Sequence, residues 1–453
     1  MKLPGWRWLF GPACGLWIVG CASHNVELLT VRESLAQGDV NAAVAEFEKR
    51  HEKQSDLLYL LDRGYLMHLA GRWEESNAAF ERAEARARDL YTKSLSRGAA
   101  SLVSNDLALP YRSTPHELQF VQYYRALNYL ALGAPDEALV EARKANAGLA
   151  SYAEATQGQE LFRQDAFLQY FTGLLYESEG EANDAVVSLR DARQRYREYQ
   201  GAFGGVSPSW LLPDYYAAAE QIGLTEELDS LRALDTTIVQ RAQAGNGDNT
   251  VVFFESGFVP YRESVNIALP VLSSEVGADR YVTEYGDHLY EYEAGRMKLD
   301  HVLAFAFPAL VPVPRQVQRC ELVLPSGEVI EAEPALDLAA IATADFQRRL
   351  PGILLKTVAR VLVKEAARKE AKEQDETLGW IVNVINVATE HADTRGWILL
   401  PGQFFMLKTR LEPGTQLLTA RFLSADGTVL DEWQRSVEVA PGQTSFAAFR
   451  SFK

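Results

Sequence analysis

The sequence predicts an α + β multidomain protein, in which a helical-hairpin solenoid over residues 21–241 precedes an α+β domain with mainly antiparallel strands over residues 250–453. Three observations predict this fold class. In the first part, small residues and glycines recur at fixed offsets, as they do in stacked helical hairpins. Residues 242–249 are polar and rich in glycine, which indicates a linker. Beyond the linker, apolar residues follow the twofold period of β-strands.

The chain opens with an expected export signal, 1–20. Its apolar run, 8–19, follows two basic residues and is shorter than the roughly 20 residues that a membrane-spanning helix needs. The run ends in a small residue followed by Cys21, and this ending resembles the lipobox of bacterial lipoproteins. The resemblance implies cleavage before Cys21, acylation with fatty acids such as palmitate, and an outer-membrane location facing the periplasm. An uncleaved anchor, or an ordinary signal peptide with a chance cysteine, is the alternative.

Composition excludes several classes of function. Acidic residues outnumber basic ones, 61 to 45, so the formal net charge is −16 and no nucleic-acid partner is expected. Cys14 leaves with the signal and Cys21 carries lipid, so Cys320 has no disulfide partner and is expected to be a small buried hydrophobe. The seven histidines show no metal-binding spacing, and no nucleophile elbow occurs. We therefore expect neither a metal nor a cofactor.

The solenoid is expected to be helical from about residue 25 to 234. Its pattern places a small residue, a glycine seven positions later, and then a small, a large apolar and a small residue. The clearest copies are Gly64, Gly71, Ser76, Phe80 and Ala83, and Gly173, Gly180, Ala185, Leu189 and Ala192; weaker ones centre on Gly133 and Gly38. This pattern resembles the tetratricopeptide repeat. The small residues let two helices approach, the glycine permits the turn, and the large residue fills the joint.

The copies are unevenly spaced. Only the interval from Gly38 to Gly71 is close to the usual period of about 34 residues, so longer intervals imply inserted loops such as 104–115. A generic array of helical hairpins is therefore the alternative. Residues 201–208 break the helices, and a last helical pair, to about residue 234, is expected to cap the array.

Equivalent positions in three copies predict the inner, concave face of the stack. These positions hold Leu61, Tyr65, His68, Phe120, Tyr123, Leu127, Phe167, Tyr170 and Leu174. Aromatic side chains offer large contact areas and are frequent at binding hot spots. We expect this groove to bind a peptide or helix from a partner protein. The alternative is that the chain's own C-terminal domain, or an inserted loop, fills it.

The C-terminal domain is expected to hold strands over 250–335, helices over 337–390 and strands over 398–450. A Pro-Ser-Gly turn at 325–327 predicts a hairpin over 317–332. Because neither strand group makes a core alone, we expect them to join in one sheet or sandwich with the helices packed on it. The first helix, to about residue 376, is expected either to kink at Pro351 or to begin a new first turn there, and a second helix is expected over 378–389. In the first helix, one side is expected to be apolar and the opposite side basic. The apolar residues are Leu350, Leu354, Val358, Val361 and Leu362, and the basic ones are Lys356, Arg360, Lys364 and Arg368.

Three segments, 257–263, 350–360 and 388–397, resemble an uncharacterised bacterial family of outer-membrane lipoproteins with tetratricopeptide-like repeats. The resemblance covers most of the chain after the signal. Genes of such families often lie near penicillin-binding-protein activator lipoproteins, and related proteins occur in flagellar structures at the outer membrane. The resemblance implies no established activity.

Two hypotheses of function follow. A repeat array offers an extended surface and no deep cleft, so we expect a lipid-anchored scaffold, without catalytic residues, for partner proteins of a cell-envelope assembly. That assembly is either peptidoglycan synthesis or a flagellar outer-membrane complex, and the C-terminal domain would be a second docking surface. The alternative is an envelope enzyme acting on glycan or peptide through Glu390, His391, Asp393 and Arg395. A helix-ending segment with a structural ion pair also explains these four residues.

Overall fold

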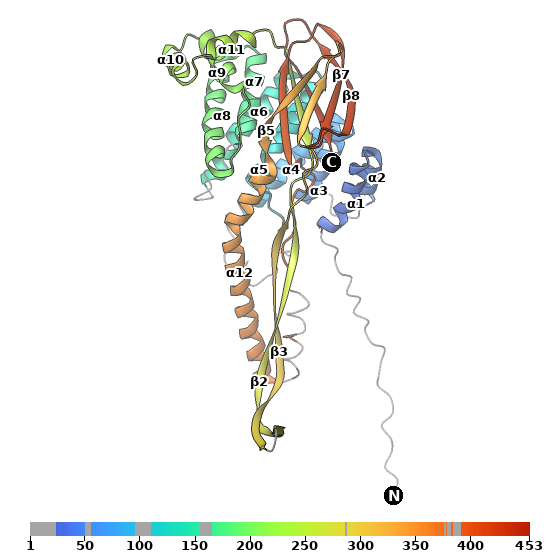
Figure 1. Ribbon diagram of the computed structural model, residues 1–453, viewed down its shortest axis with the longest axis vertical. Coiled ribbons are helices and arrows are strands. Elements are labelled where there is room, and N and C mark those ends of the chain that lie inside the picture. The colour runs from blue at the N-terminus through green and yellow to red at the C-terminus, as the bar shows by residue number, and fades with distance from the viewer. Residues whose placement is uncertain are drawn as a thin grey trace.

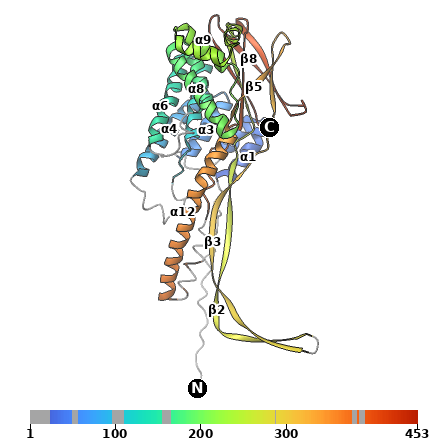
Figure 2. The same cartoon turned by 60° about the vertical axis from the view of Figure 1, so that its left-hand side comes forward.

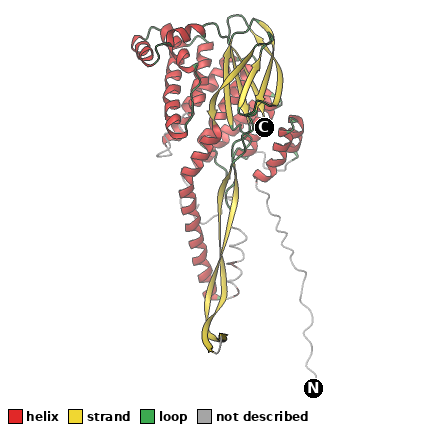
Figure 3. Ribbon diagram, in the orientation of Figure 1, coloured by secondary structure: helices red, strands yellow, loops and turns green. Residues whose placement is uncertain are grey.

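The computed structural model describes residues 24–49, 56–95, 110–154, 165–285, 288–375, 377, 382–383 and 391–453. The expected signal, 1–20, and Cys21 lie outside these residues. A helical array lies against a seven-stranded sheet, and a long hairpin and a long helix extend from them (Figure 1, Figure 3). In the described part of the chain, no helix combines the length and hydropathy needed to cross a membrane.

Eleven helices of the described chain precede the first strand. They are α1 (His24–Ala36), α2 (Val40–Glu48), α3 (Leu57–Leu69), α4 (Trp73–Leu95), α5 (Pro115–Ala131), α6 (Pro135–Glu154), α7 (Ala166–Ser178), α8 (Ala182–Phe203), α9 (Leu211–Gln221), α10 (Thr225–Leu234) and α11 (Ile238–Ala244). Successive helices pack as hairpins (Figure 1). The expected linker therefore begins inside α11 and not after the last helix.

Glycines make the hairpins possible in two ways. The turn residues Gly38, Gly71, Gly133 and Gly180 all have positive φ, from 71° to 80°, which confirms the predicted turns. Inside α3, a Cβ on Gly64 would lie 2.6 Å from the Phe80 ring, and inside α7 a Cβ on Gly173 would lie 2.7 Å from Leu189. The predicted close joints between the helices of these two hairpins are thus confirmed.

The sheet contains β1 (Thr250–Ser256), β4 (Arg319–Val323), β5 (Val329–Asp337), β6 (Gln403–Thr409), β7 (Gly414–Leu423), β8 (Val429–Val439) and β9 (Ser445–Ser451). Their order is β8-β7-β4-β5-β6-β1-β9, so the two expected strand groups do join in one sheet. Every neighbouring pair is antiparallel except β1 and β9, which are parallel.

The sheet curls into a nearly closed barrel, which the sequence did not predict. Its two edges meet where the Arg435 guanidinium donates to the Ala448 carbonyl at 3.1 Å and the Ser445 hydroxyl donates to the Glu438 carbonyl at 2.9 Å. The expectation of a mainly antiparallel sheet is corrected to a mixed one, because the last strand lies parallel to the first. Cys320 is fully buried in the barrel interior as a free thiol, which confirms its predicted role, and burial raises its pKa well above the ordinary range.

We call the remaining elements the arm: β2 (Tyr261–Tyr285), β3 (His288–Val311) and α12 (Leu338–Gln374). The two strands form a separate antiparallel ribbon, and Figure 2 shows it continuing beyond the end of α12. With 25 residues in β2 and a rise of about 3.3 Å per residue, the ribbon measures roughly 80 Å along its path.

The arm departs from two expectations. Helix α12 runs unbroken through Pro351, and it lies along β3 instead of covering the seven-stranded sheet. The helical array covers that sheet in its place, since β1 is buried along its whole length between the array and the barrel interior. The expected second helix, 378–389, falls almost entirely outside the described residues.

Candidate functional site

The concave face of the helical array is occupied by the chain's own sheet. Phe253 of β1 and Phe404 of β6 enter the aromatic row of the helices. The ring centroid of Phe167 lies 5.5 Å from that of Phe253 and 5.2 Å from that of Phe404. The Tyr123 ring lies 6.1 Å and 5.9 Å from the same two rings. These edge-to-face and tilted contacts are typical of a well-packed aromatic core.

All nine residues predicted to bind a partner lie at or beside this joint. Eight are buried: Leu61, Tyr65, Phe120, Tyr123, Leu127, Phe167, Tyr170 and Leu174. His68 is half-buried, its Nδ1 lies 2.6 Å from the Asn128 side-chain oxygen, and burial lowers its pKa to about 4. The predicted open groove is therefore corrected to an interdomain core. The alternative, in which the C-terminal domain fills the groove, describes the structure.

A polar cluster fastens the same joint. Arg450 of β9 donates from Nε to the Tyr65 hydroxyl at 2.9 Å, and its Nε lies 4.0 Å from the Glu255 carboxylate. The Tyr124 hydroxyl donates to Glu255 at 3.2 Å. Burial raises the pKa of Glu255 to about 7, although Arg450 opposes this shift. The cluster links two helices to two strands, so it fixes how the array and the sheet dock.

The segment suggested for catalysis forms a structural ion pair. Asp393 accepts hydrogen bonds from Arg395 Nε at 2.8 Å and from Nη2 at 2.9 Å. The guanidinium also lies 5.8 Å from the centroid of the Tyr111 ring, and the Arg395 carbonyl accepts from Arg262 at 3.0 Å. His391 is exposed, and Glu390 lies outside the described residues. The described geometry thus matches the structural ion pair of the alternative interpretation, while the helix that this segment was expected to end lies almost entirely outside the described residues.

The cavity beside this segment is too small for a substrate. Its volume is 30 Å³, enough for about one water molecule. Glu117 lines it and accepts from the Tyr111 hydroxyl at 2.6 Å and from the Trp397 N–H at 2.9 Å. Burial alone would raise the pKa of Glu117, but His116 and these hydrogen bonds lower it overall. Glu117 therefore acts as a fixed anion that ties the start of α5 to Trp397.

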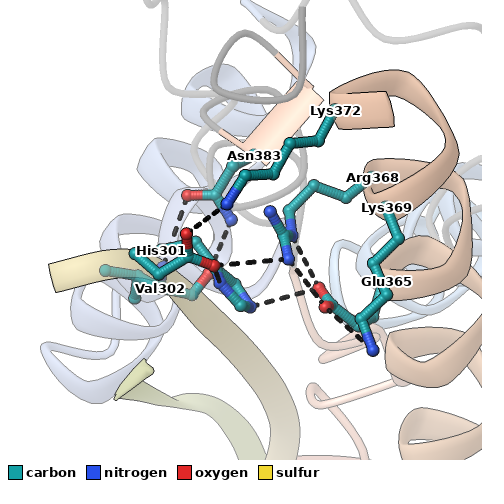
Figure 4. Close-up of polar contacts among 8 residues, drawn as sticks. His301, Val302, Glu365, Arg368, Lys369, Lys372 and Asn383 are labelled. Carbon is teal, nitrogen blue, oxygen red and sulfur yellow. Dashed lines mark hydrogen bonds and ion pairs between the residues drawn. The ribbon is translucent and has the colours of Figure 1, made fainter. Parts of the chain in front are cut away.

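Charged residues join α12 to the ribbon of the arm (Figure 4). His301 of β3 lies between two carboxylates, with Nδ1 2.8 Å from Asp300 and Nε2 3.2 Å from Glu365. Arg368 contacts Glu365 at 2.8 Å and Asp300 at 3.6 Å. Lys372 also binds Asp300, and hydrogen bonds from Lys372 and His301 lower the pKa of Asp300 to about 2.

An amide completes this junction. The Asn383 side chain donates to the Val302 carbonyl at 2.8 Å and accepts from the Val302 N–H at 3.4 Å (Figure 4). This side chain thereby satisfies the backbone of β3 as a neighbouring strand would. Specific polar contacts thus hold α12 and Asn383 against residues 300–302 of β3.

Helix α12 buries several basic residues that were expected to be exposed, and exposes several apolar residues that were expected to be buried. Arg360 and Arg368, expected on the outer face, are only 1% and 5% exposed. Leu354, Val358 and Leu362, expected inside, are 38%, 46% and 65% exposed. The expected facing of α12 is therefore wrong at these positions, although Val361, also expected inside, is only 5% exposed as predicted. Asp300 of the ribbon pairs with two basic residues of the helix, Arg368 and Lys372. Leu355 is 72% exposed and Val363 is 44% exposed on the same helix.

The ribbon also exposes apolar side chains. Ile267 is 42% exposed and Leu269 is 48% exposed, on one face of β2. Their cross-strand neighbours are Phe305 and Leu303, which are half-buried. Within the described residues β2 pairs only with β3. The sequence-based prediction did not identify the arm as a functional surface. A signal was present, because the apolar residues at 353–355 and 361–363 lie on more than one side of α12 and cannot all be buried by one neighbour.

No known protein-family model matches the chain, and no curated protein shows significant similarity to it. Among the described residues, no group of His, Cys, Asp and Glu side chains is arranged to hold a metal ion. Among the described residues, the exposed apolar side chains of α12 and β2 make the arm a candidate surface for a protein partner.

Proposed function

We propose that this protein is a lipid-anchored scaffold or adaptor of the outer membrane, and that its arm binds a partner protein of a cell-envelope assembly. In this proposal the paired helices are tetratricopeptide-like repeats that serve as a rigid support. Their concave face holds the chain's own sheet, so partner binding moves to the second surface, in the C-terminal domain.

The observation that carries the proposal is the exposed apolar stripe of α12. Leu355, Val358 and Leu362 follow one another at intervals of three and four residues, so they line one side of the helix. All three are more than one-third exposed while charged side chains on the opposite side are buried. A contiguous exposed apolar patch is a recognised mark of a protein-binding surface.

Charge indicates what kind of partner fits this stripe. Basic residues outnumber acidic ones along α12, whereas the whole chain has a net charge of −16. Lys369 and Arg348 lie seven residues beyond the two ends of the stripe, on the same side of the helix. Each also pairs with a carboxylate of α12, Lys369 with Glu365 at 3.9 Å and Arg348 with Asp345 at 3.8 Å. We propose that the partner offers an amphipathic helix with acidic residues beside its apolar ones.

The alternative, an envelope enzyme using residues 390–395, has less support. The Asp393 carboxylate and the Arg395 guanidinium bind each other, and the cavity beside them holds about one water molecule. No nucleophile or general base with a substrate-sized cleft is present among the described residues of this segment.

The test is site-specific photocrosslinking in intact envelopes, with the photoreactive residue at Leu355 or Leu362. The proposal expects one protein to crosslink from both positions. With the photoreactive residue at Leu355, replacing the other two stripe residues, Val358→Glu with Leu362→Glu, should lower the crosslink yield about tenfold or more, because two apolar contacts are lost.

Val187 on α8 provides the matched control, since it is a 45% exposed apolar residue on the array. A photoreactive residue there should not trap the same protein, and Val187→Glu should leave the arm crosslinks unchanged. Equal crosslinking before and after substitution of the stripe would refute the arm as the binding surface.

A further inference from the structure

A second possible site lies at the far end of the helical array, away from the arm. A cleft of about 690 Å³ opens between α9, α11, the turn 245–248 and β6. Its lining includes the carboxylates of Glu177, Asp214, Glu220 and Asp248, the amides of Gln243 and Asn246, and Trp210 as an aromatic wall. Two cations also line it: Lys408, and Arg241, which pairs with Asp235 at 2.8 Å. This volume lies within the range of small-molecule sites, about 300–1,000 Å³.

The floor of the cleft is a built ion pair. The Lys408 ammonium of β6 donates to one oxygen of Asp214 at 2.7 Å, and the Tyr170 hydroxyl donates to the other at 2.6 Å. The Lys408 and Asp214 side chains are 8% and 10% exposed. Asp214 therefore has both carboxylate oxygens occupied, and Lys408 is committed to it.

Two further carboxylates face the same ammonium. Glu177, at the end of α7, and Asp248, in the turn, both act on Lys408 electrostatically. Burial alone would lower the pKa of Lys408, but Asp214 and Glu177 raise it overall. Among the described residues, neither the Glu177 nor the Asp248 carboxylate forms a side-chain hydrogen bond. The Lys408 ammonium is thus shared among three carboxylates from three elements, and Arg410 is a further cation that acts on Asp248.

The pKa values of Glu177 and Asp248 are both raised. Glu177 reaches solvent through the open side of the cleft, yet the protein atoms around it and the neighbouring Asp214 raise its pKa to about 7. Burial likewise raises the pKa of Asp248. A further positive charge in the cleft would be attracted by both carboxylates and would return them to their charged forms.

The described acids are not grouped in a way that holds a metal ion. An organic cation is therefore the ligand that fits the two carboxylates. We propose that the cleft binds a small organic ligand with a primary ammonium group, held by the carboxylates of Glu177 and Asp248. Gln243 and Asn246 offer amide groups for the polar remainder of the ligand, and Trp210 offers an apolar wall. This site is independent of the arm.

Calorimetric titration of the full mature chain in detergent tests the proposal, with 1,5-diaminopentane as probe. Saturable binding is expected at pH 8. At pH 5.5 the affinity should be lower, because Glu177, which faces Asp214 of α9, Lys408 of β6 and Tyr170 of its own helix, then carries a proton. Glu177→Gln and Asp248→Asn should each weaken binding about tenfold, since each removes a charged hydrogen-bond acceptor.

Two controls keep the test decisive. Glu179→Gln changes an exposed acid on the same end of α7 that does not line the cleft, and it should leave binding unchanged. The neutral probe 1,5-pentanediol should not bind. The proposal is overturned if the diamine does not saturate, if the diol binds equally well, or if both Glu177→Gln and Asp248→Asn fold and bind as the wild type does. Crosslinking at the arm is unaffected by any of these outcomes.

Discussion

Glu255 connects the stability of this protein to pH at the scale of a single residue. It lies at the joint between the helical array and the sheet, 2% exposed, beside Tyr124 and Arg450. Burial raises its pKa from 4.5 to about 7. Between these two values the folded protein keeps a proton that the unfolded chain has already lost. The folded state binds more protons there, so Glu255 makes stability fall as pH rises from 4.5 to about 7.

The prediction concerns Glu255→Gln, which removes this titration. Relative to wild type, the variant's free energy of unfolding should increase across pH 4.5 to 7, by on the order of 1–3 kcal/mol. Above pH 7 the difference should be constant. Urea unfolding at several pH values measures it. Glu328→Gln, in an exposed turn, is the control and should show no such trend. A pH-independent difference for Glu255→Gln would contradict the assignment.

Residue-level prediction from sequence succeeded where one local rule decides the outcome. Cys320 was expected to be buried because of its alternating neighbours, and it is. Tyr123 and Phe167 were correctly placed on the inner face of the helices, but the identity of what covers them was not predictable. Phe253 and Phe404, which cover them, are distant in sequence, and no local pattern couples the two sets.

At the scale of elements, the packing of the helical hairpins depends on how closely the paired helices approach each other. In the hairpin of α3 and α4, the Gly64 carbonyl accepts a hydrogen bond from the Ser76 hydroxyl at 2.7 Å, so the two backbones nearly touch. The Phe80 ring fills the space where a side chain of residue 64 would lie. This hairpin tolerates only glycine at that point.

We predict that Gly64→Ala destabilises the protein by about 1–3 kcal/mol, because its Cβ would force the Phe80 ring to move. Gly201→Ala in α8 is the matched control, since a Cβ there meets nothing within 4 Å. That variant should be unchanged or slightly more stable, because alanine favours a helix. Thermal unfolding of both proteins checks the prediction, and equal melting temperatures would count against the close joint.

The arm shows why other elements escaped prediction. The ribbon has only two strands, and α12 lies along β3 alone, so no continuous alternation of apolar and polar residues marks its whole length. The sequence predicted strands over 250–335 but did not indicate that two of them form one long ribbon. The facing of α12 was wrong at several positions: apolar residues were placed inward by default, while carboxylates of the arm bind Arg368.

At the scale of the whole molecule, the proposed anchor decides where the scaffold works. Cys21→Ser should abolish acylation, because serine lacks the thiol that carries lipid. Each buried methylene contributes about 0.8 kcal/mol to membrane binding, so the variant should be unprocessed or leave the outer-membrane fraction. Membrane fractionation with immunoblotting checks this. A processed variant that sediments with the outer membrane as wild type does would contradict the anchor, and Cys320→Ser provides the control for loss of a thiol.

The candidate sites could be predicted from the sequence only in part, because tertiary structure brings together residues that are far apart in the chain. The cleft draws Glu177, Asp214, Asp248 and Lys408 from four separate parts of the chain. The cluster at 390–395 was noticed because its residues are adjacent in sequence, and two of them, Asp393 and Arg395, simply bind each other. Sites assembled by tertiary structure leave no local motif.

The parallel pairing of β1 with β9 has a consequence for how the chain matures. Thr250 lies beside Ser445, so the first strand of the barrel gains its second neighbour only after nearly the last residue has been delivered. Until then, the aromatic rings of the helices have no complete cover. Pairing of strands that are so far apart in the sequence is slow, and it leaves aggregation-prone intermediates exposed. A chain whose closing strand is made last is therefore expected to bind holding chaperones while it folds.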